Sequence, residues 1–535
     1  MKQVLSTELY NQFYYDFLTG SEITKKYLPS FDANAVEEAC RQIAPVTTIH
    51  AEVKKILAKQ NADYQSEKVK ASVSKLSDPK CMVIITGQQL GLLLSPIYTI
   101  YKAMTTVKLA DQMNGMNTGH TFIPVFWLET EDHDFEEIRH AGIWDRNMQP
   151  LQISYDGRNQ VQMSVRHYQL EDKIHNTLEK LQQEMLPTEF TKDLFKRIDG
   201  YYRSGRSWTA ATLDLFREIF SETGMLFFEP GTGEIKSISV AFFKDWTERI
   251  GTVGQAFSKQ SRRLESDGYS LQVPDIPGKT FMHFEDDDLQ RHHIYHEDGS
   301  FYLKDRSERW TIEDLKVLLR DSPNRFSTAV ASRPVLQSWL LPVAAYVAGP
   351  AEIAYWAQLR EIFHVMSVAF PVVYPRLSAT LIEPKIQRYI DKHKADVTGA
   401  VMKMKEFVDD YFAKNQFDRT KFKKWRSEIS GTFAQITDYI TTVDATLVPV
   451  AEKTGQRIEG QIEQLESRLL NAVEQKEKTL LNHLEQIHTA LYPLEHPQER
   501  FISIIYFLNK FGPGFLGQLM KGMNLEPKHH QILSL

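Results

Sequence analysis

Five short apolar runs, each bounded by glycine, proline or charged residues, constrain the fold of this 535-residue chain more than any other feature. They lie at residues 82–86, 122–128, 225–229, 342–348 and 370–374. Runs of this length and composition suit strands that are buried on both faces of a parallel sheet. Helical patterns occupy residues 96–113, 210–223 and 352–364 between them. Strands that alternate with helices predict an α/β fold with a doubly wound parallel sheet.

The segments outside this pattern predict hairpins and a helical domain. Residues 142–168 and 279–304 alternate in the manner of small antiparallel hairpins that do not extend the parallel sheet. After Glu383, apolar residues recur every three or four positions, first over 422–447 and then over 458–491. These two seams predict an antiparallel helical hairpin of coiled-coil character. Either the hairpin packs only against the rest of its own chain, or it is exposed and also forms a dimer.

Charge and hydropathy exclude several classes of protein. The net charge is -6, from 63 basic and 69 acidic residues, so nothing favours generic binding to nucleic acid. No apolar run approaches the ~20 residues of a membrane span, and the first residues lack the pattern of a signal peptide. We therefore expect a cytoplasmic protein without membrane contact. The two cysteines, Cys40 and Cys81, cannot form a four-cysteine zinc site.

Ligands of a doubly wound sheet bind beyond the carboxyl ends of its strands, where the strand order reverses. Four predicted strands are followed there by polar or glycine-containing turns. These turns are Gly87-Gln88-Gln89-Leu90-Gly91, Glu129 to Phe135, Gly349-Pro350-Ala351-Glu352 and Pro375-Arg376-Leu377-Ser378. Ser95-Pro96 predicts the entry to the following helix, with Ser95 as N-cap and Pro96 in the first helical position.

The turn TEDHDFEE carries the densest cluster of acids, with a histidine among them. Unpaired charge is costly in a core, so these side chains face water or a site. His133, flanked by Asp132 and Asp134, is a candidate general base for an amine or hydroxyl. Two alternatives remain open: a metal site formed by His133, Asp134 and His140, or acids that favour the N-terminus of a helix.

Basic and aromatic residues provide candidate nucleotide contacts. Lys102, Arg333, Arg376 and Lys385 are candidate anion partners, and Arg376 with Ser378 could meet a phosphate. The aromatic C-terminal segment carries Arg500, Tyr506, Asn509, Lys510 and Phe511. It is either a nucleotide-stacking surface or a helix that docks an apolar face on the core. The chain lacks GxxxxGK[ST], GxGxxG, GxSxG and HExxH motifs, which disfavours P-loop kinases, dehydrogenases, serine hydrolases and zincins.

Five segments together resemble one family nearly end to end. They are TGQQLGLLLSPIYTIYK, PVFWLETEDHDFEEI, VAGPAEIAYWAQL, YPRLSATLIE and PQERFISIIYFLNKFG, and they resemble the BshC family, the cysteine-adding proteins of bacillithiol synthesis. The resemblance implies a Rossmann-like core related to class I aminoacyl-tRNA synthetases and pantothenate synthetases, two connective-peptide insertions and an α-helical coiled-coil domain. The implied reaction is the ligation of cysteine to glucosaminyl-malate, the last step to bacillithiol.

Amide formation from a carboxylate needs activation, most simply as an acyl-adenylate, so we expect ATP with Mg as a substrate complex. On the resemblance, His133 and Asp134 lie nearest the proton transfer. Its implied substrate-binding residues are Gly87, Gln88, Gln89, Gly91, Tyr98, Gly349, Pro350, Glu352 and Trp356. The expected nucleotide-binding residues are Arg376, Ser378, Lys385, Arg500, Tyr506, Asn509, Lys510 and Phe511.

The sequence also departs from synthetase relatives. It has no clear HIGH or KMSKS motif, and the zinc ligands expected by analogy with cysteinyl-tRNA synthetases are absent, so we expect no zinc. The expected partners are cysteine, glucosaminyl-malate, a nucleotide and a second copy of the chain, bound through the coiled coil. The alternative function is a non-catalytic dimeric scaffold that binds a small molecule of the same pathway.

These expectations divide the chain into seven segments. The Rossmann-like core comprises 1–140, 191–268 and 331–387, and the connective insertions comprise 141–190 and 269–330. The coiled-coil domain spans 388–492, and the C-terminal segment 493–535 packs back on the core.

Overall fold

The structure is a computed structural model that describes residues 2–4, 10–43, 48–116, 118–157, 163–304, 306–397, 404–415, 419–476 and 478–535. The chain forms two compact units. The larger one, here called the sheet unit, comprises Gln3–Thr380 and Glu499–Leu533. The smaller one, the helical unit, comprises Met1–Lys2, Leu381–Gln498 and Ser534–Leu535.

A five-stranded parallel sheet forms the centre of the sheet unit. Its strands, in spatial order, are β13 (Val372–Pro375), β12 (Val343–Ala348), β2 (Cys81–Gln88), β3 (Thr121–Leu128) and β6 (Leu226–Phe228). All four strand pairs are parallel. Each strand coincides with one of the five apolar runs, because strands covered on both faces expose almost no side chain. The predicted doubly wound α/β sheet is confirmed.

The strand order reverses between β2 and β12. From β2 the chain builds outward through β3 to β6, and it then returns to the other side of β2 for β12 and β13. Helices before such a point cover one face and those after it the other, which leaves a crevice at the carboxyl ends of the two central strands. The turns after β2 and β12 therefore meet at the place where ligands of this fold bind.

The helix α6 (Tyr98–Gly115) links β2 to β3 as predicted, but its entry differs from the prediction. The Ser95–Pro96 peptide is cis, and Ile97 is the N-cap, without a side-chain cap. Ile97 donates its backbone N–H to the carbonyl of Ile502 at 2.7 Å, which holds this residue outside the helix. The predicted helix 352–364 is divided into α15 (Pro350–Trp356) and α16 (Arg360–Val365).

The sheet unit also contains two antiparallel sheets, as the alternating patterns predict. The hairpin of β4 (His140–Trp144) and β5 (Pro150–Ser154) is the first. The second has the order β10 (Arg309–Trp310), β9 (Ser300–Leu303), β8 (Arg291–Glu297), β7 (Lys279–Glu285) and β11 (Phe326–Thr328). Val165–His167, inside the pattern 142–168, forms a 3-10 turn and not a strand.

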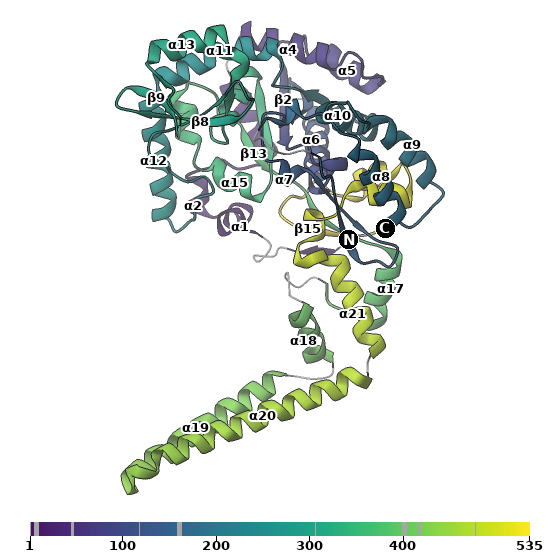
Figure 1. Cartoon of the computed structure of the whole chain (residues 1–535), viewed down its shortest axis with the longest axis vertical. Helices are drawn as coiled ribbons and strands as arrows, with labels where there is room; N and C mark the ends of the chain where they lie inside the picture. The colour runs from purple at the N-terminus through teal and green to yellow at the C-terminus, as the bar shows by residue number, and fades with distance from the viewer. Residues whose placement is uncertain are drawn as a thin grey trace. The chain divides into compact units, whose positions relative to one another are not determined.

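The other helices of the sheet unit surround these sheets (Figure 1). They are α1 (Gln12–Thr19), α2 (Glu22–Lys25), α3 (Ala33–Gln42), α4 (Thr48–Gln60), α5 (Glu67–Lys75), α7 (Phe135–Ile138), α8 (Lys173–Glu184), α9 (Thr191–Tyr201), α10 (Trp208–Ile219), α11 (Gly233–Glu248), α12 (Ile250–Ser266), α13 (Ile312–Asp321), α14 (Arg333–Leu340), α22 (Ile504–Phe511) and α23 (Phe515–Gly522). A further sheet has the order β1 (Lys2–Val4), β15 (His530–Ser534) and β14 (Ser378–Ile382). Among the described helices, none is both long and apolar enough to cross a membrane.

The helical unit contains the predicted hairpin. Its helices are α17 (Pro384–His393), α18 (Met404–Asn415), α19 (Arg419–Val443), α20 (Val448–Lys476) and α21 (Lys478–Leu491). The helices α19 and α20 run side by side in opposite directions, joined by the short turn Ala445–Leu447 (Figure 1). Arg426 donates to Glu466 across the pair at 2.8 Å. The coiled-coil prediction is confirmed.

Candidate active site

Lys102, a buried residue of α6, joins the carboxyl ends of β2 and β12. Its ammonium donates to the carbonyl of Gly87, to Gln88 Oε1 at 3.1 Å and to Glu352 Oε2 at 2.6 Å. The backbone N–H of Gly349 donates to the same Glu352 oxygen at 2.7 Å. Burial alone would raise the pKa of Glu352, but the charge of Lys102 holds that pKa below its ordinary value. Four predicted substrate-binding residues thus meet at the strand-order reversal, positioned by a lysine.

The loop after β2 needs glycine for steric reasons. A Cβ at Gly91 would lie 1.9 Å from the carbonyl oxygen of Ser95, so no other residue fits. Near the end of β2 itself, a Cβ at Gly87 would lie 3.1 Å from Glu129 Oε1. Gly91 thus allows the loop to pass close to its own backbone and has a clear structural role.

A second buried charge pair follows β3. Arg333, at the start of α14, donates to Glu129 Oε1 at 2.6 Å and to the hydroxyl of Tyr355 at 2.6 Å. The two charged side chains are 16% and 13% exposed. Arg333, a candidate anion partner from the sequence, thus lies at the carboxyl end of the sheet and already binds the Glu129 carboxylate.

The polar cluster after β3 centres on Asp132. Its carboxylate accepts hydrogen bonds from Gln89 Nε2 at 2.5 Å and from the backbone N–H of His133 at 2.7 Å, and Arg291 NH1 lies 3.7 Å away. Arg291 comes from β8 and is anchored by donation to the carbonyl of Thr328 at 2.6 Å. Desolvation favours the neutral acid, yet the Arg291 charge and these hydrogen bonds hold the pKa of Asp132 below its ordinary value. Asp132 is thus a carboxylate in a partly open site.

His133 is held between this carboxylate and a guanidinium. Its Nδ1 lies 3.3 Å from Arg291 NH1 and 3.6 Å from Asp132 Oδ1. A guanidinium can only donate, so Nδ1 accepts and the neutral ring carries its proton on Nε2. Burial, and then the Arg291 charge, lower the pKa of His133 below 6.5. The imidazole is therefore neutral at physiological pH and able to take up a proton, as a general base must be.

These groups line a cavity of about 330 Å³ beyond the carboxyl end of β3. The cavity contains both acids and bases, including Glu129, Glu131, Lys279 and Arg333. Its remaining lining comes from Trp127 of β3 and from the second antiparallel sheet and its connections: Val273, Phe281, His283, His293, Thr328, Ala329 and Val330. Within the described part of the chain, no group of three His, Cys, Asp or Glu side chains is arranged to hold a metal ion.

Asp134 has a different environment from His133. It is exposed, and its Oδ1 accepts the backbone N–H of Glu137 at 3.1 Å as the N-cap of α7. Of the interpretations that the sequence left open, these contacts fit an acid that stabilises a helix N-terminus. Asp132, its neighbour in the sequence, is the acid that lines the cavity.

The three other predicted substrate-binding residues have mainly structural contacts. Trp356 is 1% exposed and packs against Tyr346 at a ring distance of 4.8 Å. Pro350 is the first residue of α15. The hydroxyl of Tyr98 accepts a hydrogen bond from Gln88 Nε2 at 3.3 Å, so Tyr98 helps to position the loop after β2.

Two of the predicted nucleotide-binding residues are part of a buried network. Arg376 donates to the two oxygens of Glu499 at 3.0 and 2.6 Å, and both side chains are 3% exposed. Ser378 donates to Glu499 at 2.8 Å and lies 2.6 Å from His530 Nδ1. The Arg376 charge holds the pKa of Glu499 below its ordinary value although burial opposes it. These groups are bound to one another in the interior.

The predicted nucleotide-binding residues of the C-terminal segment lie on or near α22. Asn509 accepts from Thr191 Oγ1 at 2.7 Å and donates to the carbonyl of Leu186 at 2.9 Å, which fixes α22 to its neighbours. Phe511 stacks on Phe515 at 5.5 Å, and Tyr506 packs edge-on against Trp144 at 5.0 Å. The ammonium of Lys510 lies 5.6 Å from the Tyr506 ring. Arg500 is exposed, and Lys385 belongs to the helical unit.

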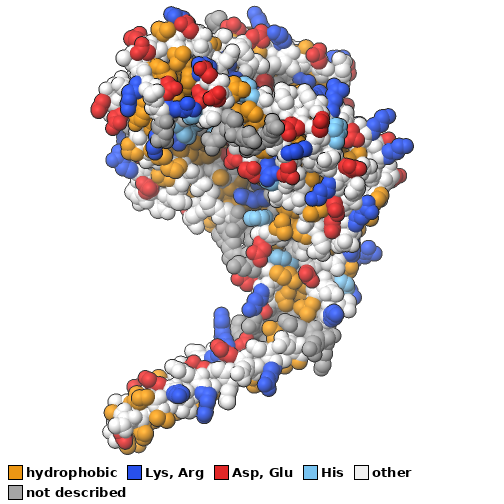
Figure 2. Space-filling model, viewed as in Figure 1, with side chains coloured by type: hydrophobic (Ala, Val, Ile, Leu, Met, Phe, Trp, Pro, Cys, Tyr) orange, Lys and Arg blue, Asp and Glu red, His pale blue; other side chains and the backbone are white. Residues whose placement is uncertain are grey.

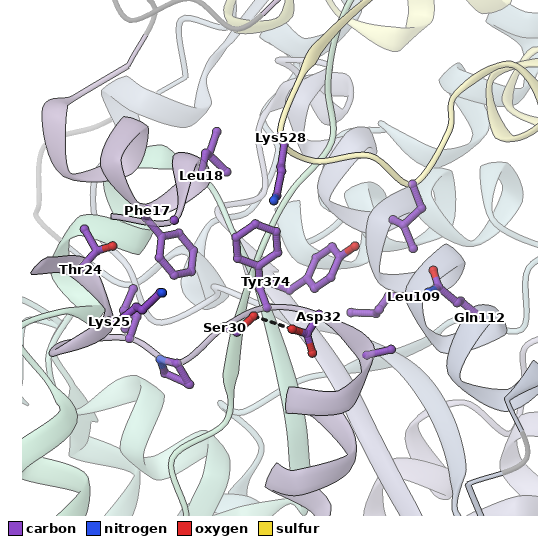
Figure 3. A pocket seen from close by; sticks show the side chains of 16 residues that line it. Phe17, Leu18, Thr24, Lys25, Ser30, Asp32, Leu109, Gln112, Tyr374 and Lys528 are labelled. Atoms are coloured by element: carbon purple, nitrogen blue, oxygen red, sulfur yellow. Dashed lines mark hydrogen bonds between the residues drawn. The ribbon is translucent and has the colours of Figure 1, made fainter. Parts of the chain in front are cut away.

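A second cavity of about 330 Å³ lies among the N-terminal helices, α6 and β13. Figure 3 shows Phe17, Leu109 and Tyr374 around it, with Ser30 bonded to Asp32 at 2.7 Å. Its lining, as far as the chain is described, includes none of the residues that the sequence pointed to. Of these two cavities, the one beside His133 combines carboxylates, cations and imidazoles at the carboxyl end of the sheet.

Comparison with known proteins gives the family. The N-terminal Rossmann-like domain of the bacillithiol biosynthesis protein BshC matches residues 1–377, and the C-terminal coiled-coil domain of BshC matches residues 379–535. The chain belongs to the BshC family. The central parallel sheet is accordingly a Rossmann-like fold.

Individual relatives agree with this assignment. A protein of Bacillus licheniformis named "Putative cysteine ligase BshC" is 29% identical over 543 residues, which covers 99% of each chain. A protein of the same name from Salinibacter ruber is 29% identical over 480 residues, covering 88% of this chain and 86% of the relative.

Sequence reasoning missed part of the cavity wall. Arg291, His283 and His293 belong to β7 and β8, in a segment that the sequence indicated only as connecting hairpins. The run RHHIYH carries three histidines and an arginine within six residues, which was the available signal. Their proximity to His133 depends on tertiary structure, since about 150 residues separate them in the chain.

Proposed function

We propose that this protein is a cysteine ligase that joins cysteine to glucosaminyl-malate by an amide bond, the last step of bacillithiol synthesis. Membership of the BshC family supports the pathway. The observation that carries the proposal is the cavity beside His133, where a neutral imidazole, a carboxylate and a guanidinium lie together at the carboxyl end of a Rossmann-like sheet. A scaffold has no need of such a cluster.

The proposed reaction has two steps. An oxygen of the cysteine carboxylate attacks the α-phosphorus of ATP, pyrophosphate leaves, and cysteinyl-adenylate forms. The free amine of glucosaminyl-malate then attacks the carbonyl carbon, the bond between this carbon and the AMP oxygen breaks, and the nitrogen loses a proton. The protein lowers the barrier by orienting the two reactants and by receiving that proton.

In this scheme His133 receives the proton of the attacking amine on Nδ1. The hydrogen bond that Nδ1 accepts from Arg291 breaks in the same step. Asp132 orients the imidazole through the backbone and stabilises the charge that it acquires. Lys102 and Glu352 hold the turns after β2 and β12 in place, and Gln89 donates to Asp132, which lines the cavity. Lys102 and Glu352 act as positioning residues.

ATP with Mg is the proposed energy donor. The metal ion would be held mainly by phosphate oxygens and water, which is the usual binding mode of Mg²⁺ in nucleotide sites. This mode needs no protein cage of several ligands. Six candidate nucleotide contacts lie outside the Arg376–Glu499 network: Lys385, Arg500, Tyr506, Asn509, Lys510 and Phe511. Of these, we propose Lys510, Tyr506 and Arg500 of the C-terminal segment. We place the reaction in the cytoplasm, where the buried, unpaired Cys40 and Cys81 would remain reduced.

Mass spectrometry of the purified protein incubated with cysteine, glucosaminyl-malate and ATP-Mg tests the proposal. Formation of bacillithiol with AMP supports the adenylate route, and bacillithiol with ADP indicates an acyl-phosphate instead. Folded protein that forms no amide product under these conditions contradicts the ligase function. Omitting each substrate in turn provides the controls.

We further propose that the chain forms a homodimer through the hairpin of α19 and α20. Apolar side chains remain exposed on the hairpin although its two helices already pack together. Tyr439 and Val443 are each 71% exposed, and Val450 is 60% exposed. Figure 2 shows apolar side chains gathered around the turn of the hairpin. A second copy would cover them, as in a coiled-coil interface.

A further inference from the structure

His283 is a buried imidazole of β7 that the proposed mechanism does not use. It is 4% exposed and lines the cavity beside His133. Its Nδ1 lies 3.3 Å from the carbonyl oxygen of Thr328, and a carbonyl can only accept, so Nδ1 carries the proton. Its Nε2 is buried and has no hydrogen-bond partner within the described residues. An unpartnered acceptor of this kind is costly unless a ligand donates to it.

The imidazole stays neutral. Burial, and then the charge of Arg291, hold the pKa of His283 well below 6.5. His293, its partner across the strand pair at a ring distance of 4.1 Å, has its pKa lowered to about 4, mainly by burial. Metal binding by these rings is opposed by Arg291 and Lys279, which line the same cavity. His283 therefore offers one neutral acceptor nitrogen.

The surroundings of His283 select the kind of donor. Phe281, two residues earlier in β7, lines the same cavity, as do Val273 and Ala329, and all three are buried. Two carboxylates of the cavity have their own counterparts: Glu129 pairs with Arg333, and Glu131 pairs with Lys236. An ammonium or carboxylate on the ligand is best placed near those charges, whereas a neutral donor is suited to a neutral acceptor beside apolar walls.

We propose that His283 is a specificity-determining residue whose Nε2 accepts a hydrogen bond from the thiol of the cysteine substrate. This inference rests on the proposed ligase function. The thiol is the only neutral donor of cysteine, and sulfur packs favourably against aromatic rings such as Phe281 and Trp127 of this cavity. The arrangement recognises the thiol without zinc, through one oriented imidazole.

A matched pair of variants tests the inference. In His283→Asn the amide can replace Nδ1 in the bond to Thr328, but the acceptor at the Nε2 position is lost. In His283→Gln the longer amide places a polar group where Nε2 lies. Cysteine is compared with 2-aminobutyrate, in which a methyl group replaces the thiol at similar size, by kcat/KM for amide formation and by calorimetric binding to the full-length protein.

We expect the wild type to prefer cysteine, His283→Asn to lose about tenfold of that preference, as for one hydrogen bond, and His283→Gln to recover part of it. If folded His283→Asn prefers cysteine over 2-aminobutyrate as the wild type does, within twofold, the inference is wrong. It is also wrong if this variant loses affinity for glucosaminyl-malate alone, because His283 would then bind a sugar hydroxyl. If His283→Asn fails to fold, the preference of His283→Gln decides, because it must stay above that for an Ala variant. A wild type that neither binds nor uses cysteine overturns the ligase function and this inference together.

Discussion

The cavity beside His133 and the network around Arg376 both follow strands of the sheet unit and both contain charged side chains, but their chemistry differs. Arg376 and Glu499 are 3% exposed and bind each other through two hydrogen bonds. His133 and Asp132 are 29% and 34% exposed, and the neighbouring His283 keeps an acceptor without a partner in the described chain. Charges that are saturated by one another stabilise a fold, whereas groups with remaining hydrogen-bonding capacity can act on a ligand.

The largest effect is expected from breaking the saturated pair. Arg376→Met leaves the Glu499 carboxylate buried and unpaired, and loss of one partner of such a pair costs about 3–5 kcal/mol of the free energy of unfolding. Urea denaturation of the sheet unit in the full-length protein measures this loss. If Arg376 instead binds nucleotide, the variant keeps its stability and raises the KM for ATP.

The matched control removes both charges. Arg376→Met combined with Glu499→Leu eliminates the unpaired carboxylate, so the double variant should be more stable than Arg376→Met alone. A double variant that is less stable than the wild type by the sum of the two single losses would show that the two side chains do not act as a pair.

The next effect concerns turnover at the cavity. His133→Ala should lower kcat by roughly 10²- to 10⁴-fold, the usual contribution of a general base, with a small change in KM. Asp134→Ala is the control from the same turn: it should cost about 1 kcal/mol of stability as a lost N-cap and keep most of the turnover. Steady-state kinetics and thermal unfolding of both variants measure this. Equal turnover of His133→Ala and wild type removes His133 from the mechanism.

The pH dependence is expected to change with Arg291. His133 acts as a base only when neutral, so kcat falls as the pH drops through its pKa, which lies below 6.5 because of burial and then of Arg291. Arg291→Gln removes that positive charge, so the pKa of His133 rises and the acidic limb of the profile moves to higher pH. A profile of kcat between pH 5 and 8 for both proteins tests this. An acidic limb that stays in place means that another group titrates.

The smallest effect on turnover is expected at the hairpin. Tyr439→Glu and Val443→Glu place charges on the exposed apolar surface of α19. The proposed homodimer should dissociate, because its interface would then bury an unpaired charge. The kcat should remain within about twofold of the wild-type value. Light scattering after size exclusion measures the mass. Lys424→Glu, a change at another exposed position of α19, is the control. A wild-type monomer contradicts the dimer.

The sequence was most informative where a local pattern determines the structure. The five strands could be predicted because both-face burial leaves continuous apolar runs. The alternation of strands and helices predicts a parallel sheet but not its strand order, so only the family resemblance placed the turns after β2 and β12 around one substrate. The hairpin of α19 and α20 follows from the spacing of apolar residues.

Other features depend on partners that are distant in the sequence. Arg376 resembles a phosphate contact until Glu499, 123 residues later, is placed against it. Asp132 and Asp134 look alike in the sequence. Asp134 is a helix cap because α7 starts directly after it, whereas Asp132 lines the cavity. His283 and Arg291 approach His133 because a hairpin folds over the end of the sheet, which no local pattern indicates.

A crystal structure of the protein with a sulfamoyl analogue of cysteinyl-adenylate would show where cysteine is activated. We expect the cysteinyl end in the cavity beyond β3, within contact of His133, with its thiol at His283 Nε2. A cysteinyl end bound elsewhere, for example in the cavity between Phe17 and Tyr374, would contradict the assignment of the site.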